Sequence, residues 1–149
     1  MTTLIHQATI VNEGQQFIGS VLIKDQRIAA IIRGTDVTGL TADHIIDAKG
    51  QYLIPGCIDD HVHFRDPGLT HKADMATESL AAIAGGVTSV MDMPNTSPAT
   101  TTAQTLQQKI ALAKEKSVAK MSFHIGATNV NAAEISSLVR EGDLSTGLR

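Results

Sequence analysis

The sequence is poor in the residues that cross-link a small domain or fill its core with rings. It has one cysteine, Cys57, which excludes an internal disulfide, and no tryptophan; three phenylalanines and one tyrosine are its only aromatic residues. A core must therefore be built from Ile, Val, Leu, Ala and Met, in a chain that is 42% hydrophobic. With 149 residues the chain has the length and composition of one ordinary globular domain.

Runs of like charge and long apolar runs are also lacking. Twelve Lys and Arg against fifteen Asp and Glu give a net charge of -3, with no basic cluster suited to nucleic acid or an anionic membrane. No apolar stretch is long enough to span a bilayer, and Met1–His6 lacks the charged-then-apolar pattern of a secretory signal. We expect a cytoplasmic protein that acts on a small molecule and binds neither nucleic acid nor membrane; a homo-oligomer stays open.

Residues 1–52 are predicted to form a small β-sheet domain. Apolar segments alternate with Asn12–Gly14 and Lys24–Gln26, whose Gly, Asn and Asp residues are typical of hairpin connections. These segments are too few to close an independent sandwich, so we expect other strands or a neighbouring domain to cover the apolar face. The predicted strands are Leu4–Ile5, Ala8–Val11, Gly19–Ile23 and Arg27–Ile32.

Residues 53–149 are predicted to form three strand–helix units. Parallel neighbours need a crossover connection of about a dozen residues, so strand–helix repeats indicate a parallel sheet or barrel. The expected fold class is α/β, the first part of a (β/α)8 TIM-type barrel preceded by the small β-rich domain. Three of eight units leave an open strand edge. The first strand is entered through Tyr52–Ile54 and Cys57–Ile58, the later strands are Val87–Met91 and Met121–Ile125, and the helices are Ala73–Ala84, Thr102–Lys116 and Ala132–Arg140.

The most informative stretch is Pro55–Gly68. In an extended strand side chains alternate between faces, so Asp59, His61, His63 and Arg65 are expected on one side. Four polar side chains on one face of an otherwise buried strand are costly unless something binds them. We therefore expect a site at the C-terminal end of this strand, the edge where barrel enzymes keep their active sites.

His61 and His63 are the candidate metal ligands. Two imidazoles at i and i+2 can each place a nitrogen about 2.0–2.1 Å from one cation, and zinc suits this ligand type best. Asp59 is expected to orient one of these histidines. On spacing alone, the alternative of two ordinary surface or core histidines stays open.

This stretch resembles the signature of the dihydroorotases, in the amidohydrolase superfamily. Asp59–Pro67 fits the pattern Asp-x-His-x-His-x-Arg-x-Pro, while Gly85–Thr88 and Met93–Thr96 fit the second barrel strand and its loop. The resemblance implies a zinc-dependent cyclic amide hydrolase, usually with two ions, that interconverts L-dihydroorotate and N-carbamoyl-L-aspartate in pyrimidine biosynthesis. It also implies that the remaining metal ligands and a proton-shuttling aspartate lie beyond Arg149.

Arg65 and Asn95 are implied by the same resemblance to hold the substrate carboxylate. A planar guanidinium grips a carboxylate through two hydrogen bonds, and relatives that open hydantoins or allantoin lack arginine at this place. The alternatives are a solvated charge for Arg65 and a turn residue after Pro94 for Asn95. For the whole protein, the alternatives are a dihydropyrimidinase-like or hydantoinase-like hydrolase and a non-catalytic dihydroorotase-like scaffold subunit.

Three further residues have structural interpretations. His124 is expected to be a hydrogen-bonded structural histidine rather than a ligand, because no partner with metal spacing accompanies it. Cys57 is expected to be a small buried residue of the first strand. Asp92 either lines the rim of the site or serves a turn or a cap.

Overall fold

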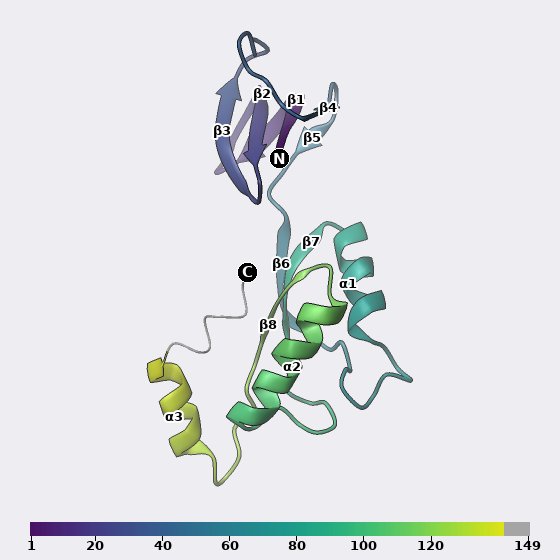
Figure 1. Ribbon diagram of the computed structural model, residues 1–149, viewed down its shortest axis with the longest axis vertical. Helices are drawn as coiled ribbons and strands as arrows, with labels where there is room; N and C mark the ends of the chain where they lie inside the picture. The colour runs from purple at the N-terminus through teal and green to yellow at the C-terminus, as the bar shows by residue number, and fades with distance from the viewer. Residues whose placement is uncertain (142–149) are drawn as a thin grey trace. The chain divides into compact units, whose positions relative to one another are not determined.

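The computed structural model describes residues 1–141 of the chain. The chain divides into two compact units, of which the first is Met1–Pro55 and the second begins at Gly56. Figure 1 shows that the first unit contains strands only, whereas the second alternates strands with helices. The first unit is therefore an all-β structure, and the second is an α/β structure.

The first unit is a five-stranded sheet. Its strands are β1 (Thr2–Asn12), β2 (Gln15–Lys24), β3 (Arg27–Arg33), β4 (His44–Asp47) and β5 (Tyr52–Leu53). They are ordered β3-β2-β1-β4, and β5 also pairs with β1. The first three strands are antiparallel neighbours, while β4 and β5 run parallel to β1. Ala8, Ile10, Val21 and Ala48 form the buried core of this sheet.

Two-residue turns connect the first three strands. Glu13 and Gly14, between β1 and β2, have φ angles of 50° and 71°, and Asp25 begins the next turn with a φ of 57°. Positive φ angles match the twist of an antiparallel hairpin, which is why Gly, Asn and Asp are favoured at such turns. Both hairpins predicted from the sequence are confirmed.

Strand β1 is longer than predicted. Leu4–Ile5 and Ala8–Val11, predicted as separate strands, belong to one strand whose register shifts between Ile5 and Ala8. Gln7 lies in this bulge with a φ of 54°. A bulge inserts an extra residue without ending the pairing, so the interrupted apolar pattern did not mark a turn.

The first unit also extends further along the chain than residue 52. Tyr52–Leu53, expected to lead into the first barrel strand, instead pairs with Thr9 and Ile10 of β1. A short apolar segment can join either sheet, and the choice depends on the partner strand rather than on the segment. The division between the units accordingly falls after Pro55.

The second unit is an open parallel sheet with helices between its strands. The strands β6 (Cys57–Val62), β7 (Val87–Asp92) and β8 (Lys120–Phe123) are neighbours in that order. The helices are α1 (Met75–Ala84), α2 (Ala103–Lys116) and α3 (Ala132–Glu141). Helix α1 packs on β7 and helix α2 on β8, and the two helices touch (Figure 1). The three predicted strand–helix units are confirmed, as a sheet that is open within residues 1–141.

One hydrophobic core joins this sheet to α1 and α2. Phe64, Met75, Val90, Leu106 and Met121 are all buried in it. Burying one side chain of this size contributes about 1.5–3 kcal/mol relative to leaving it exposed. The core therefore fixes the helices against the sheet and, through Phe64, also holds the first residues after β6.

A side-chain cap sets the start of α1. The carboxylate of Asp74 accepts hydrogen bonds from the backbone N–H groups of Ala76 at 2.9 Å and Thr77 at 3.1 Å. These are donors that the first turn of a helix leaves open. The bond from Thr77 above all lowers the pKa of Asp74, because it stabilises the carboxylate. The helix consequently begins at Met75 rather than at the predicted Ala73.

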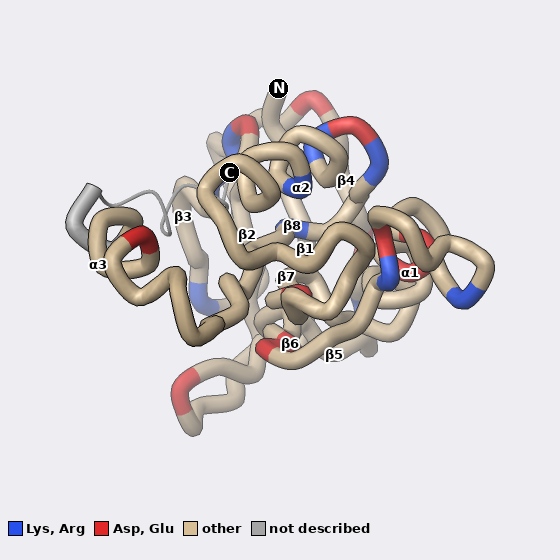
Figure 2. Tube along the Cα trace, turned by 90° about the horizontal axis from the view of Figure 1, so that it is seen from below, with Lys and Arg blue, Asp and Glu red and all other residues tan. Residues whose placement is uncertain are grey.

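Charged residues are interspersed along the chain. Figure 2 shows short segments of Lys and Arg and of Asp and Glu separated by long uncharged segments. Within residues 1–141, none of the helices has the length and apolar character needed to cross a bilayer.

Candidate active site

The C-terminal ends of β6, β7 and β8 lie at one edge of the parallel sheet (Figure 1). His61 is near the end of β6 and His63 follows it, Asn95 follows β7, and His124 follows β8. Because parallel strands end at the same edge, α/β folds place their ligand sites there. The sheet thus brings together residues that are distant in the sequence.

The regular alternation predicted for β6 stops before the site. The step from Asp59 to Val62 on β6 pairs with the shorter step from Val90 to Asp92 on β7, so β6 carries a bulge. The strand ends at Val62, and Arg65 lies in the following loop with a φ of 63°. The prediction that one extended strand aligns four polar side chains on one face is therefore wrong, because the bulge redirects side chains and the strand is too short.

The two candidate metal ligands nevertheless come together. The ring centroids of His61 and His63 are 5.2 Å apart and the ring planes meet at 61°. With metal–nitrogen bonds of about 2 Å, rings at this separation are close enough to bind one ion. No set of three or more His, Cys, Asp or Glu side chains within residues 1–141 could hold such an ion. Zinc normally takes three or four protein ligands, so the described residues fit one part of a metal site.

Asn95 holds the ring of His63 from the loop after β7. Its Oδ1 lies 2.8 Å from His63 Nδ1, and since an amide oxygen can only accept, Nδ1 donates. A neutral imidazole protonated at Nδ1 has its lone pair on Nε2. Histidines that bind metals are commonly held in this way through the other ring nitrogen. Asn95, predicted as a substrate-binding residue, thus also orients a candidate ligand.

Asp59 contacts the main chain of its own strand. Its Oδ1 accepts a hydrogen bond from the backbone N–H of His61 at 3.1 Å. The sequence predicts that Asp59 orients a ligand histidine; this contact acts on the His61 backbone within the bulge, while the His63 ring is held by Asn95.

Arg65 lies in a loop that packs against the loop carrying Asn95. Its φ of 63° is in the left-handed region, which costs a residue with a Cβ about 1–2 kcal/mol. The N–H of Ser97 donates to the carbonyl of Pro67 at 3.1 Å. A Cβ on Gly68 would lie 2.0 Å from the carbonyl oxygen of Ser97, so only glycine fits this approach. The loops of the two predicted carboxylate-binding residues are therefore in direct contact.

Asp92, the last residue of β7, and Lys109 of α2 form a buried ion pair. Lys109 Nζ is 2.7 Å from Asp92 Oδ2, and both side chains are 1% exposed. Among residues 1–141, Asp92 Oδ2 accepts no hydrogen bond of good geometry, so the contact depends on charge. Burial lowers the pKa of Lys109, and the Asp92 carboxylate opposes that shift. Sequence reasoning left Asp92 as a rim, turn or cap residue and missed Lys109 altogether.

The sequence does contain a signal for Lys109. This lysine stands at helical spacing between Leu106 and Ala113, on the face of α2 that is buried. A charged residue on an apolar stripe requires either exposure of its tip or a buried partner. The pattern could have indicated that a partner exists, but not which residue it is.

One of the two lesser candidates behaves as predicted. The ring Nε2 of His124 lies 3.0 Å from the backbone carbonyl oxygen of Asp60, to which it donates. The hydrogen bond expected for this histidine is therefore present, whereas its role as a structural residue rather than a ligand stays a prediction. Cys57, predicted as buried, is exposed, because β6 is an edge strand of the sheet that the described residues form.

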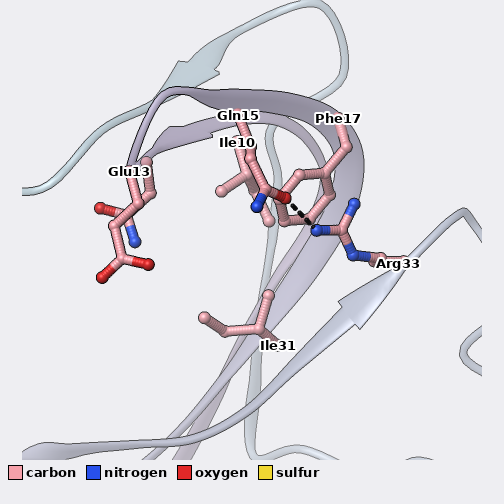
Figure 3. Close-up of a pocket in the computed structure, with 7 residues that line it drawn as sticks. Ile10, Glu13, Gln15, Phe17, Ile31 and Arg33 are labelled. Atoms are coloured by element: carbon pink, nitrogen blue, oxygen red, sulfur yellow. Dashed lines mark hydrogen bonds between the residues drawn. The ribbon is translucent and has the colours of Figure 1, made fainter.

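The first unit has a separate hollow without comparable chemistry. Ile10, Phe17 and Ile31 line it together with Arg33 (Figure 3). The Arg33 guanidinium carbon lies 3.9 Å from the centre of the Phe17 ring, and Arg33 donates to Gln15 Oε1 at 2.5 Å. Neither histidine nor cysteine is among the lining residues. The hollow therefore does not compete with the strand ends as a candidate metal site.

The family of the chain follows from a comparison with known proteins. A family model described as dihydro-orotase-like matches residues 50–139. The chain belongs to the dihydro-orotase-like family. The matched range contains His61, His63, Arg65 and Asn95, so the candidate site lies wholly within the family domain.

Members of the dihydro-orotase-like family with similar sequences include dihydroorotases from several organisms. The chain is 41% identical to the dihydroorotase of Lactobacillus helveticus over 131 residues, which cover 88% of this chain and 29% of that protein. It is 43% identical to the dihydroorotase of Methanothermobacter thermautotrophicus over 109 residues, which cover 73% of this chain and 24% of that protein. The chain thus spans less than a third of these relatives.

Solved structures with similar folds include an L-hydantoinase and a dihydropyrimidinase. The L-hydantoinase (dihydropyrimidinase) from Arthrobacter aurescens has a TM-score of 0.87 at 28% identity, over 93% of this chain and 31% of that one. The dihydropyrimidinase from Brevibacillus agri has a TM-score of 0.79 at 32% identity, over 95% of this chain and 32% of that one. Their names correspond to one of the alternatives left open by the sequence.

Proposed function

We propose that this chain is the first part of a zinc-dependent cyclic amide hydrolase that interconverts L-dihydroorotate and N-carbamoyl-L-aspartate in pyrimidine biosynthesis. The observation that carries the proposal is the meeting of His61, His63 and Asn95 at the strand ends of a dihydro-orotase-like chain. The chain spans 29% of the Lactobacillus helveticus relative, so the activity is proposed for a full-length protein that contains it. We place that protein in the cytoplasm.

His61 and His63 are proposed as two of the zinc ligands. Asn95 Oδ1 accepts a hydrogen bond from His63 Nδ1 and so favours the tautomer that leaves the Nε2 lone pair for a cation. Zinc bound there would lower the pKa of a coordinated water and polarise the substrate carbonyl. The other ligands, a second ion and the proton-shuttling aspartate are expected from further strands of a (β/α)8 barrel beyond Arg149.

Arg65 and Asn95 are proposed to hold the carboxylate of the substrate. The guanidinium offers a planar pair of donors for a carboxylate. Asn95 uses its Oδ1 on His63, which leaves both hydrogens of its Nδ2 for the substrate. This carboxylate lies outside the scissile amide. Holding it therefore orients the substrate ring relative to His61 and His63. The loops that carry these two residues contact each other at Gly68 and Ser97, which supports a shared role.

A dihydropyrimidinase-like or hydantoinase-like hydrolase is the second candidate. The similar structures from Arthrobacter aurescens and Brevibacillus agri favour it. Arg65 argues against it, because a hydantoin or dihydropyrimidine ring has no carboxylate for the guanidinium to bind. A non-catalytic scaffold subunit is the third candidate, and the presence of both His61 and His63 with their rings together argues against that role.

Substrate turnover by the full-length protein separates these candidates. We expect hydrolysis of dihydroorotate and not of unsubstituted dihydrouracil or hydantoin. Replacing Arg65 by alanine should reduce kcat/KM for dihydroorotate by roughly a hundredfold, because hydrogen bonds between charged groups contribute about 1.5–3 kcal/mol. A wild-type protein that prefers dihydrouracil or hydantoin would support the second candidate instead.

Arg65→Gly is the matched control for the backbone. Glycine adopts a φ of 63° without strain, so the Gly and Ala variants differ in backbone strain but both lack the guanidinium. Equal losses of kcat/KM assign the effect to the side chain, whereas near wild-type turnover by the Gly variant would contradict carboxylate binding. Metal analysis addresses the third candidate: a folded protein that purifies without zinc and without turnover would support the scaffold.

A further inference from the structure

Asp92 connects the ends of all three strands at the candidate site. Its Oδ1 accepts a hydrogen bond from the backbone N–H of Phe64 at 2.9 Å, immediately after His63. Its backbone carbonyl accepts from the N–H of His124 at 3.0 Å. A single residue at the end of β7 therefore bonds to the segments that leave β6 and β8.

Lys109 extends these contacts to the loop of Asn95. Its Nζ donates to the carbonyl of Met93 at 2.8 Å and lies 2.7 Å from Asp92 Oδ2. Met93 in turn donates its N–H to the carbonyl of Val62 at 2.9 Å. The chain on each side of the hydrogen bond between His63 and Asn95 is thus attached to the same ion pair.

The chemistry of the Asp92–Lys109 pair suits the positioning of neighbours better than stabilisation alone. Two charges with 1% exposure lose hydration that their mutual attraction hardly restores, and an apolar pair of similar volume would avoid that loss. Apolar packing is not directional, however. Hydrogen bonds to Phe64 and Met93 define where each backbone segment lies.

We propose that Asp92 and Lys109 are positioning residues of the site, which set the separation of the His63 and Asn95 loops and thereby the orientation of the His63 ring. The role rests on the proposed function in one respect, namely that His63 and Asn95 belong to the active site. Asp92 and Lys109 act through their neighbours and do not touch the substrate.

NMR of the histidine ring nitrogens in the metal-free 149-residue chain tests this role without an activity assay. The double variant Asp92→Asn/Lys109→Met removes both charges together, so that no unpaired charge is buried, and keeps an acceptor for Phe64. The double variant Asp92→Ala/Lys109→Met removes that acceptor as well. The His63 Nδ1 resonance should shift toward that of a free imidazole in both variants, and further in the Ala variant.

A second readout follows the Phe64 amide. In Asp92→Ala/Lys109→Met its hydrogen exchange should accelerate on the order of tenfold, as expected for the loss of one hydrogen bond to a charged acceptor. In Asp92→Asn/Lys109→Met the amide oxygen of the new side chain should retain most of the protection. The difference in exchange rate between the two variants reports whether the loop after β6, which carries His63 and Phe64, has been released.

Leu106→Ala is the matched control on the same helix. Leu106 is 2% exposed in the core, and its truncation destabilises the second unit through a cavity while leaving Asp92 and Lys109 in place. We expect lower stability and an unchanged His63 Nδ1 resonance. The proposal is overturned if the Asp92→Ala/Lys109→Met variant leaves that resonance unchanged, or if Leu106→Ala shifts it equally. An inactive full-length protein whose His63 resonance still responds to the double variants would contradict the proposed function and leave the positioning role intact.

Discussion

Two lysines of helix α2 reach aspartates at similar distances, yet their ion pairs differ. Lys109 lies 2.7 Å from Asp92 with both side chains 1% exposed, whereas Lys116 lies 2.9 Å from Asp66 with the lysine 35% and the aspartate 3% exposed. Burial lowers the pKa of Lys109. The hydrogen bond with Asp66 raises the pKa of Lys116.

The difference shows that burial, rather than distance, decides what an ion pair does to the molecule. Water reaches Lys116 and screens its charge, so this pair is weaker than one from which water is excluded, and water can approach the buried Asp66 carboxylate once the lysine is removed. Water is excluded around Lys109 and Asp92, so that removal of either partner leaves a bare charge inside the protein. Loss of Lys116 should therefore cost less than loss of Lys109, whose pair with Asp92 bonds to both Phe64 and Met93.

The largest expected effect is that of Lys109→Met. The variant leaves the Asp92 carboxylate buried without its positively charged partner, so the free energy of unfolding of the second unit should fall by about 3–5 kcal/mol. Denaturant unfolding of the chain measures this loss. The double variant Asp92→Asn/Lys109→Met should regain most of the lost stability. If the double variant is as unstable as the single one, the unpaired charge is not the cause of the loss, and the contrast drawn between the two ion pairs is wrong.

A second, smaller effect tests packing as the rival means of holding the loops. Gly68 has a φ of 85° and faces Ser97, while Gly86 has a φ of 87° and open space where its Cβ would be. Gly86→Ala should lose about 1 kcal/mol through backbone strain alone, and Gly68→Ala about 1–3 kcal/mol more through the added clash. Thermal unfolding of the two variants gives the difference. Equal losses would mean that the Gly68 loop yields, leaving the Asp92–Lys109 pair as the main restraint.

Lys116→Met should cost less stability than Lys109→Met, and its effect should depend on pH in a defined direction. The pKa of Lys116 in the folded chain is above 10.5, so its contribution is complete below 10.5 and is lost as pH rises through the folded value. The stability difference between wild type and variant should therefore shrink in alkaline denaturation series. The pH dependence expected for Lys109 has the opposite sign. Because its pKa is lowered by burial, the cost of burying its charge is relieved as pH rises toward 10.5. A Lys116→Met difference that grows with pH would contradict the assignment of the two pairs.

The smallest expected effect concerns Asp74, the cap of α1, which Lys116 also faces. The lowered pKa of Asp74 means that its contribution is present above the ordinary value of 3.8 and is lost as pH falls through the folded value. Asp74→Asn keeps a capping oxygen that does not titrate. Its helix should match wild type near neutral pH and lose less in acid, as measured by hydrogen exchange of Thr77. Identical acid sensitivity in both proteins would assign it to other carboxylates.

Elements with a local signal were predictable from the sequence. The hairpin turn at Glu13 and Gly14, the helix in front of Gly85 and the strand–helix alternation after Gly56 all appear where neighbouring residues indicate them. The bulge in β1 and the pairing of Tyr52–Leu53 were not, since both depend on a partner strand elsewhere in the chain. Strand register depends on the neighbouring strand as much as on the sequence of the strand itself.

For the candidate site, too, the residues could be named from the sequence, whereas the contacts between them could not. His61, His63, Arg65 and Asn95 could be named from their spacing and their resemblance to a family, and their roles in binding stay predictions. The contact between His63 and Asn95 joins residues 32 apart in the sequence, and no pattern pointed to it. Nor did any pattern pair Asp92 with Lys109, because two positions on different elements meet only once the helix packs on the sheet.

The sequence alone determined which side chains carry charge or imidazole, where the chain turns and the family to which it belongs. These properties follow from side-chain chemistry and from dihedral preferences of residues close in the chain. Only the tertiary structure decided that Asn95 orients His63 and that Asp92 and Lys109 bond to the loops on both sides of that contact. Buried contacts between distant residues depend on how parallel strands align and where a helix packs, and neither is encoded in any short stretch of residues.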